Sequence, residues 1–363
     1  TLPMGVGINF VINGKDYVIP MVTEEPSVVA ACSNAAKMAR PGGGFTTDYT
    51  GSVMISQIQL LDVPAPFYAK GKILENKEKI AEICNARDPM LVKLGGGVKD
   101  VEVRVLDSLV GPMVVVHLLV DTGDAMGANA VNTMAEAVAP FLEELTGGRA
   151  ELRILSNLAD HRIARARAVF KKDAIGGEEV VDKMIAAYAF AAADPYRAAT
   201  NNKGIMNGII PVVIATGNDT RAIESGAHAY AARSGQYSPF ATWEKNADGD
   251  LVGSIEMPMA VGLVGGATKI HPAAKVAVKM LGVKTAGELA QIIAAVGLAQ
   301  NMAAMRALAT EGIQRGHMSL HARNLAATAG ATGELLEKIV KQMVSEKNVR
   351  LEYAQELVKQ YQK

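Results

Sequence analysis

The stretch MVVVHLLVDTGDAMGAN, residues 113–129, carries the pattern that is most informative about the fold. Its continuous apolar run from Met113 to Val120 is typical of a strand buried on both faces. The chain then turns through Thr122 and Gly123 into a helix that we expect to run from about Asp124 to Leu145. Small residues in a first helical turn let an anion approach the free N–H groups and the positive end of the dipole. The alternative is an ordinary helix start, and the pattern alone favours it.

The sequence on either side of this stretch completes a repeating order of strands and helices. Residues 56–60 alternate apolar and polar side chains, as do residues 101–105 and 151–154, and each run predicts a strand. A helix is predicted where Ile73, Ile80 and Cys84 recur at helical spacing. Gly111-Pro112 predicts a hairpin between the second and third strands. The resulting order, βαββαβ, matches the ferredoxin-like plan and disfavours a doubly wound sheet.

We therefore expect an α+β protein with an inserted domain. Residues 52–156 form the predicted cofactor domain, and residues 1–51 and 157–313 form a helix-rich large domain around it. The stretch Leu289–Thr310 contains one charged residue, Arg306, and is interrupted by polar side chains, which predicts a buried helix rather than a membrane span. Residues 314–363 are rich in charge and are predicted to form a small helical C-terminal flap.

Composition limits the classes of function. Among 363 residues, 37 Lys and Arg balance 37 Asp and Glu, which removes the broad attraction to nucleic acid or anionic membranes. Cys32 and Cys84 cannot build a disulfide framework or a structural zinc site, which indicates a reducing, cytoplasmic setting. The motifs of P-loop, Rossmann, zincin and serine-hydrolase sites are absent from the sequence.

A few polar residues are candidates for chemistry, but their spacing in the sequence does not show that they meet in the fold. Lys203 lies in a turn-prone Asn-Asn-Lys-Gly stretch, and Asp219 follows some way on, although most lysines in such places are only solvated. Glu25 precedes Pro26 and Ser27 in a predicted helix entry. His317 and His321 share a helix face, yet no carboxylate follows them in a zincin-like pattern, so a proton donor is favoured over a metal site and no metal is expected.

Six motifs in order along nearly the whole chain carry a family resemblance. They are EEPSVVAA (24–31), DAMGAN (124–129), VNTMAE (131–136), DPYR (194–197), NKGIMNG (202–208) and GHM (316–318). With them the chain resembles 3-hydroxy-3-methylglutaryl-coenzyme A (HMG-CoA) reductase of the soluble bacterial type, class II. That family interconverts HMG-CoA with mevalonate and coenzyme A, a four-electron reaction with two hydride transfers from a nicotinamide cofactor.

The resemblance implies roles for particular residues. Lys203 would stabilise the oxyanion, Glu25 would give a proton to the carbonyl oxygen, and His317 would protonate the departing thiolate. Asp219 would hydrogen-bond within the same cluster. Ser27 and Arg197 would bind the substrate carboxylate, a group that suits a bidentate arginine. Thr200, Asn207 and Asn301 would lie nearby.

The resemblance also places the cofactor in the inserted domain. The implied cofactor-binding residues are Asp88, Asp124, Met126, Gly127, Ala128 and Asn129. Asp88 falls where NAD-preferring members carry an acid for the ribose hydroxyls, and a carboxylate there repels a 2′-phosphate, so NAD(H) is favoured. Arg87 beside it could contact that phosphate, which leaves NADP(H) open.

The family forms its sites between two subunits, so a homodimer or a multiple of one is implied, with the flap closing over the site. An N-terminal part with an ENVIG-type motif should precede Thr1 and is absent from this sequence. Two alternatives to the biosynthetic enzyme remain. One is the same enzyme working mainly in the degradative direction, from mevalonate with NAD+. The other, least favoured, is a silent homologue that acts as a scaffold.

Overall fold

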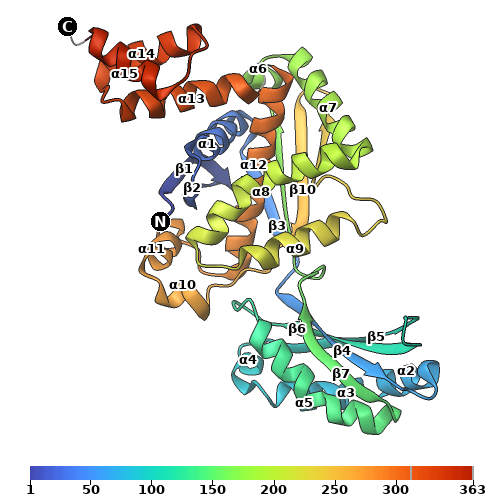
Figure 1. Ribbon diagram of the computed structural model, residues 1–363. Coiled ribbons are helices and arrows are strands. Elements are labelled where there is room, and N and C mark those ends of the chain that lie inside the picture. The colour runs from blue at the N-terminus through green and yellow to red at the C-terminus, as the bar shows by residue number, and fades with distance from the viewer. Residues whose placement is uncertain (311–312, 362–363) are drawn as a thin grey trace.

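The structure, a computed structural model, describes the backbone of residues 1–310 and 313–361 and the side chains of residues 1–310 and 321–361. It contains two sheets, each covered by helices (Figure 1). The six-stranded sheet has the order β2-β1-β3-β8-β10-β9. Its strands are β1 (Met4–Ile12), β2 (Lys15–Val22), β3 (Phe45–Tyr49), β8 (Ile163–Phe170), β9 (Ala241–Lys245) and β10 (Leu251–Pro258).

The four-stranded sheet confirms the predicted ferredoxin-like plan. It comprises β4 (Val53–Leu61), β5 (Gly97–Leu106), β6 (Met113–Asp121) and β7 (Arg149–Ser156). The strand order is β5-β6-β4-β7 and every pair is antiparallel. The connecting helices are α2 (Pro66–Glu75), α3 (Lys77–Asn85), α4 (Pro89–Lys93) and α5 (Ala128–Thr146). β6 is buried on both faces, as its apolar run predicts.

Two helix predictions in this unit need correction. The predicted first helix is broken at Asn76, whose side chain donates to the Lys72 carbonyl and whose backbone leaves the helical region. The helix predicted from Asp124 begins four residues later, at Ala128. Residues 122–127 form a loop instead, because the Thr122 hydroxyl donates to the Ala125 carbonyl and Gly127 adopts a φ of +99°.

The second unit is built around α12 (Ala286–Ala309), the buried helix that the sequence predicts. It packs against α1 (Pro26–Ala39), α7 (Glu178–Ala193), α8 (Pro195–Ala215) and strands of the six-stranded sheet. α12 is long and apolar enough to cross a membrane, but most of its surface is buried inside the protein. The remaining helices here are η1 (Arg40–Gly42), α6 (Lys172–Ile175), α9 (Thr220–Ala231), α10 (Gly266–Ile270) and α11 (Pro272–Leu281).

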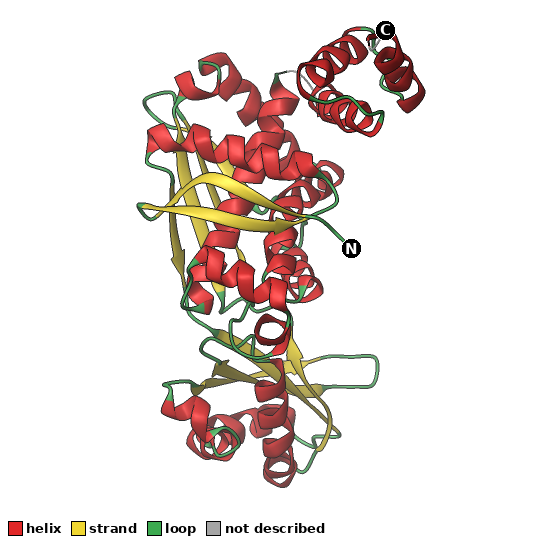
Figure 2. Cartoon of the chain, turned by 90° about the vertical axis from the view of Figure 1, so that its left-hand side faces the viewer, coloured by secondary structure: helices red, strands yellow, loops and turns green. Residues whose placement is uncertain are grey.

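The C-terminal residues form three helices with their own apolar cluster. They are α13 (Ile313–Thr328), α14 (Gly333–Ser345) and α15 (Leu351–Tyr361). Ala322, Ile339, Met343 and Leu357 are among the side chains buried between them. Both views show these helices as a separate group beside the main body (Figures 1 and 2). Their helical structure agrees with the helical character that the sequence predicts for the C-terminal residues.

Candidate functional site

A cavity of about 570 Å³ lies between the start of α1, one face of α8 and the C-terminal half of α12. Seven residues that the resemblance singled out line it, although they come from three separate segments. They are Glu25, Ser27, Arg197, Thr200, Lys203, Asn207 and Asn301. The fold therefore brings together side chains up to 276 positions apart in the chain, which spacing alone could not do. We call this the substrate cavity.

Glu25 is fixed by the entry into α1. It is the N-cap residue, and Pro26 occupies the first helical position, where its lack of an N–H costs nothing. The Ser27 hydroxyl donates to the Glu25 carboxylate, and the Glu25 N–H faces the Thr23 hydroxyl at 3.4 Å. These contacts hold a half-buried acid at the edge of the cavity.

α8 supplies the cations. Arg197, Thr200, Lys203 and Asn207 follow one another at intervals of three or four residues, which places them on one face of the helix. Asp194 caps the helix start by accepting from the Tyr196 N–H at 3.2 Å. The cavity thus presents a guanidinium and an exposed ammonium group opposite a carboxylic acid, a set that can bind an anion and polarise a carbonyl.

The floor of the cavity is a buried chain of amides. Trp243 Nε1 donates to Asn301 Oδ1 at 2.8 Å, and Asn301 Nδ2 donates to Asn201 Oδ1 at 3.0 Å. Asn301 is only 2% exposed, so its hydrogen bonds with Trp243 and Asn201 fix the orientation of its amide. Next to it, Gln300 is 6% exposed and its Oε1 has no hydrogen-bond partner within the described chain.

Gln300 was missed by the sequence analysis. A buried acceptor without a partner is costly, and here it belongs to a residue that lines the cavity. A donor on a bound ligand would satisfy it. The available signal was a pair of adjacent polar residues, Gln300 and Asn301, within an otherwise apolar helix.

A second pocket, of about 580 Å³, lies where the 122–127 loop and the start of α5 meet two loops of the larger unit. We call it the cofactor pocket. Five of the six predicted cofactor residues line it: Asp88, Met126, Gly127, Ala128 and Asn129. The larger unit contributes residues 217–219 and the glycine-rich segment around Gly265 and Gly266.

Asp124 departs from its predicted role. It does not line the pocket, because its carboxylate accepts from the Ala286 N–H at 2.7 Å and so occupies the N-terminus of α12. Its carbonyl accepts from Leu263 and Val264. Asp124 therefore fastens the loop to the larger unit. The sequence could not show this, since Ala286 is 162 residues away.

The shape of the cofactor pocket fits a phosphate group. Gly127 is the N-cap of α5, and among the described side chains none caps that helix. A Cβ on Gly127 would lie 2.4 Å from Thr122 Cγ2, and one on Gly262 would lie 2.5 Å from the Met126 N atom. Only glycine allows this close packing of the loop. The first N–H groups of α5, without a cap from the side chains that the structure describes, border a pocket lined by small residues.

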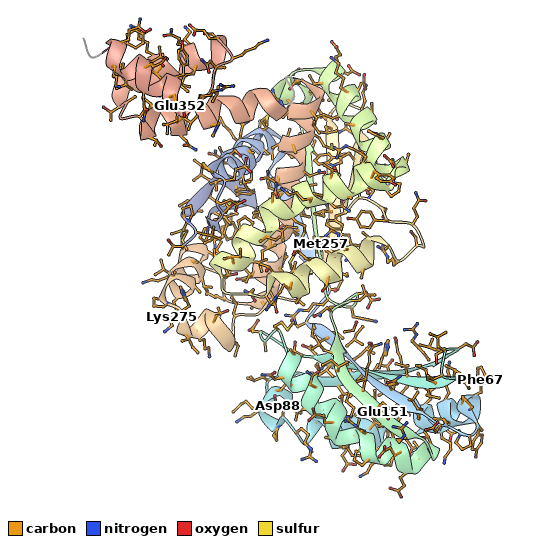
Figure 3. The ribbon with its side chains drawn as sticks, in the orientation of Figure 1. Phe67, Asp88, Glu151, Met257, Lys275 and Glu352 are labelled. Atoms are coloured by element: carbon orange, nitrogen blue, oxygen red, sulfur yellow. The ribbon has the colours of Figure 1, made fainter. Side chains whose placement is uncertain are left out.

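Asp88 and Arg87 lie side by side at the edge of this pocket, and Figure 3 labels Asp88 in the unit built on the four-stranded sheet. Asp88 is the N-cap of α4, and its Oδ1 accepts from the Leu91 N–H at 2.9 Å. Its other oxygen makes no hydrogen bond within the described chain, while Arg87 is exposed. This edge of the pocket therefore presents one acid and one cation side by side.

Asp219 lies in the cofactor pocket and not in the substrate cavity. It caps α9 through the N–H groups of Arg221 and Ala222, and its carboxylate also binds the Arg221 guanidinium. That guanidinium, with the two backbone donors, lowers the pKa of Asp219. Within one chain the expected hydrogen bonding of Asp219 with Glu25 and Lys203 is therefore not seen.

Helix geometry fixes the separation. Ala215 lies twelve positions after Lys203 on α8, a rise of about 18 Å, and Asp219 follows beyond the end of the helix. Along α12, the Ala286 end beside the 122–127 loop is about 21 Å from Gln300 in the substrate cavity. Side chains cannot bridge such a gap. The substrate cavity and the cofactor pocket of one chain thus lie about 20 Å apart along its central helices.

The remaining predicted residue, His317, belongs to α13, but its side chain lies outside the described residues. His321 is exposed on the same helix. Among the described side chains, no group of three or more His, Cys, Asp or Glu is arranged to hold a metal ion.

Comparison with known proteins identifies the family of the chain. The profile of the hydroxymethylglutaryl-coenzyme A reductase family matches residues 1–322. The chain is 64% identical to the 3-hydroxy-3-methylglutaryl-coenzyme A reductase of Archaeoglobus fulgidus over 98% of this chain and 82% of that one. A relative in Borreliella burgdorferi, named as a probable enzyme of the same kind, is 39% identical over 90% of this chain and 75% of its own length.

A solved structure extends the likeness to three dimensions. The class II 3-hydroxy-3-methylglutaryl-CoA reductase of Streptococcus pneumoniae, bound to NADPH in open conformations, matches with a TM-score of 0.84 and 42% identity. The match covers 100% of this chain and 89% of that one. With a family profile over most of its length and relatives well above 30% identity, the chain belongs to the hydroxymethylglutaryl-coenzyme A reductase family.

Proposed function

We propose that the chain interconverts HMG-CoA with mevalonate and coenzyme A, using a nicotinamide cofactor. The observation that carries this proposal is the substrate cavity, where Glu25, Lys203 and Arg197 meet in one space although they come from separate segments. The printed names of the relatives and the NADPH of the Streptococcus pneumoniae structure support it.

Each residue of the cavity then has a task. Arg197 and Ser27 bind the substrate carboxylate, and Thr200, Asn207 and Asn301 surround the rest of the acyl group. Lys203 stabilises the negative charge that develops on the carbonyl oxygen, and Glu25 supplies a proton to that oxygen. His317 protonates the coenzyme A thiolate as it leaves. The cofactor, when bound, supplies the hydride in each of the two reduction steps.

The cofactor pocket holds the dinucleotide in this proposal. The uncapped start of α5 at Gly127, Ala128 and Asn129 binds the pyrophosphate, and Met126 lies against the cofactor. Asp88 accepts from ribose hydroxyls, which favours NADH. Arg87 is the competing influence, since a guanidinium there would attract the 2′-phosphate of NADPH. We propose NADH as the preferred cofactor, with NADPH also used.

A homodimer completes the site. The two half-sites of one chain are about 20 Å apart, so hydride transfer requires the cofactor pocket of one subunit to face the substrate cavity of the other. Asp219 then reaches Lys203 and Glu25 from the partner subunit. Residues 314–363 act as a flap that brings His317 over the site and excludes water.

The proposal also includes three functional domains and a cytoplasmic location. Residues 1–51 and 157–313 bind HMG-CoA, residues 52–156 bind the cofactor, and residues 314–363 form the flap. Cys32 and Cys84 are both buried free thiols, which suits a reducing cytoplasm.

A spectrophotometric assay tests the function directly. HMG-CoA is supplied with NADH or NADPH, and in separate reactions mevalonate and coenzyme A are supplied with NAD+ or NADP+. We expect oxidation of two reduced cofactors per HMG-CoA, faster with NADH. Turnover in neither direction with either cofactor would contradict the proposal.

A further inference from the structure

Arg162 is an arginine whose whole side chain is buried. It lies between β7 and β8, where the chain returns from the small unit to the larger one, and its exposed fraction is 0%. A buried guanidinium is costly unless its donors are satisfied and its charge is balanced. Its surroundings therefore need a physical explanation.

Each nitrogen of this guanidinium donates, and together they have five hydrogen-bond acceptors. Nε donates to the Tyr49 hydroxyl at 2.7 Å, and Nη2 donates to the Val261 carbonyl at 2.5 Å. Nη1 lies 3.1 Å from each of three acceptors in the 122–127 loop, which are the Thr122 hydroxyl and the carbonyls of Ala125 and Met126. The side chain thus joins β3, the loop and the segment after β10.

Every one of these acceptors is neutral. Within the described side chains, Arg162 makes no ion pair. The acids next to its acceptors in sequence bind other groups: Asp48 pairs with Arg165, Asp121 accepts from the Gly123 N–H, and Asp124 accepts from the Ala286 N–H. The buried positive charge is therefore satisfied by hydrogen bonds but not neutralised. It lies directly behind the Met126–Gly127 peptide, whose far side opens on the cofactor pocket.

We propose that Arg162 is a positioning residue for the dinucleotide, which rests on the proposed cofactor pocket. It holds the 122–127 loop in shape and adds a fixed positive charge behind the uncapped start of α5. An anionic oxygen bound by the Gly127 N–H would lie at most about 8 Å from Nη1. At that distance, and at the effective dielectric of a partly buried site, a full charge strengthens anion binding about thirtyfold.

The charge and the hydrogen bonds can be separated by substitution. Arg162→Lys keeps the charge but cannot satisfy every acceptor, whereas Arg162→Gln keeps some donors and removes the charge. If Arg162 had only a structural role, both substitutions would lower the affinity for the dinucleotide equally. The proposal predicts that affinity falls in the order Arg, Lys, Gln.

The probe is ADP-ribose, which carries the pyrophosphate without the nicotinamide, and its dissociation constant is measured by calorimetry on the whole chain. We expect binding about thirtyfold weaker in Arg162→Gln and within about fivefold of the parent in Arg162→Lys. The matched control is Arg167→Gln, an exposed arginine of β8, which should bind like the parent. Equal affinities in the Gln and Lys variants would overturn the proposal.

Two further outcomes remain informative. Circular dichroism shows whether Arg162→Gln folds. If it does not, Arg162→Lys and Tyr49→Phe replace it, because both retain the charge, and their affinity for ADP-ribose should stay within about fivefold of the parent. A thirtyfold loss of affinity in either variant overturns the proposal. If the parent binds neither ADP-ribose nor NADPH, the proposed function itself fails. Normal reductase activity with unchanged ADP-ribose binding in Arg162→Gln defeats only this inference.

Discussion

The substrate cavity and the cofactor pocket are built in opposite ways. The cavity is lined by polar side chains at helical intervals on α8 and α12, so its chemistry lies in residue identity. The pocket is lined mostly by small residues, and we propose that it binds its ligand through the backbone N–H groups beside Gly127. We therefore expect substitution of a functional group to lower turnover strongly in the substrate cavity, whereas one added methyl group should lower cofactor affinity strongly in the cofactor pocket.

The largest effect is expected at Lys203. Lys203→Ala removes the cation proposed to stabilise the oxyanion, and we expect turnover to fall by about a thousandfold or more. Calorimetry with NADPH should show little change in the dissociation constant, because the residues proposed to bind the dinucleotide line the cofactor pocket and Lys203 does not. A control at Lys275, on α11 outside both regions, should retain activity as Lys275→Ala. A similar loss in that control would remove Lys203 from the proposed chemistry.

Gly127→Ala tests the second region. Its φ of +99° and the 2.4 Å approach to Thr122 make any Cβ strained at this position. We expect cofactor affinity to fall by about a hundredfold while the affinity for HMG-CoA stays within about threefold. Gly123→Ala is the comparison, since its Cβ would meet nothing within 4 Å although its φ is also positive. An equal loss in both variants would mean that backbone strain, and not the close packing on Thr122, controls the pocket.

A substitution at Gln300 tests whether the substrate cavity offers a hydrogen-bond acceptor to the substrate. Because its Oε1 lacks a partner in the described chain, a donor on the substrate should satisfy it. Gln300→Leu keeps the volume and removes the acceptor, and we expect the KM for HMG-CoA to rise about tenfold with cofactor affinity unchanged. An unchanged KM would show that the acceptor faces water and not substrate.

The cofactor preference at Asp88 should respond more weakly. Asp88→Asn keeps an oxygen that can cap α4 but removes the charge that repels a 2′-phosphate. We expect the ratio of kcat/KM for NADH over NADPH to fall roughly fivefold to tenfold. The paired variant Arg87→Ala should move the ratio in the opposite direction. If neither variant moves the ratio, these two residues do not select the cofactor.

The smallest effect concerns pH and stability at Asp219. The Arg221 guanidinium and two backbone donors lower the pKa of Asp219 in the folded chain. The ionised carboxylate therefore stabilises the fold at pH values above the pKa of Asp219 in the unfolded chain, which is near 3.8. That contribution is lost as the pH falls through the lower folded-state pKa. Urea unfolding of the parent and of Asp219→Asn should therefore differ at pH 6 and converge at pH 2. A difference that persists at pH 2 would assign the effect to capping alone.

The sequence predicted the parts of this protein that depend on periodicity. Alternation in β4, β5 and β7 and the apolar run of β6 were sufficient for the ferredoxin-like order, and the weakly charged stretch after Leu289 predicted α12. Element ends were less predictable: α5 starts late because a hydroxyl of Thr122 and a positive φ at Gly127 hold a loop that helical periodicity does not reveal.

The candidate site depended on contacts between distant segments. The family resemblance supplied the residues of the substrate cavity, but not Gln300, whose unsatisfied oxygen appears only when α12 is packed. Asp124 was assigned to the cofactor because it lies in the same motif as Gly127, whereas its carboxylate binds the start of α12. Arg162 carried no sequence signal, because its five acceptors come from three separate segments.

The central claim is that one active site uses the substrate cavity of one chain and the cofactor pocket of another. The most direct test mixes two inactive variants, Lys203→Ala and Asp219→Ala, under conditions that exchange subunits. In a mixed dimer one site contains both mutations and the other contains neither, so random exchange should restore about a quarter of the parent activity. No recovery, with exchange verified by mass spectrometry, would contradict the shared site.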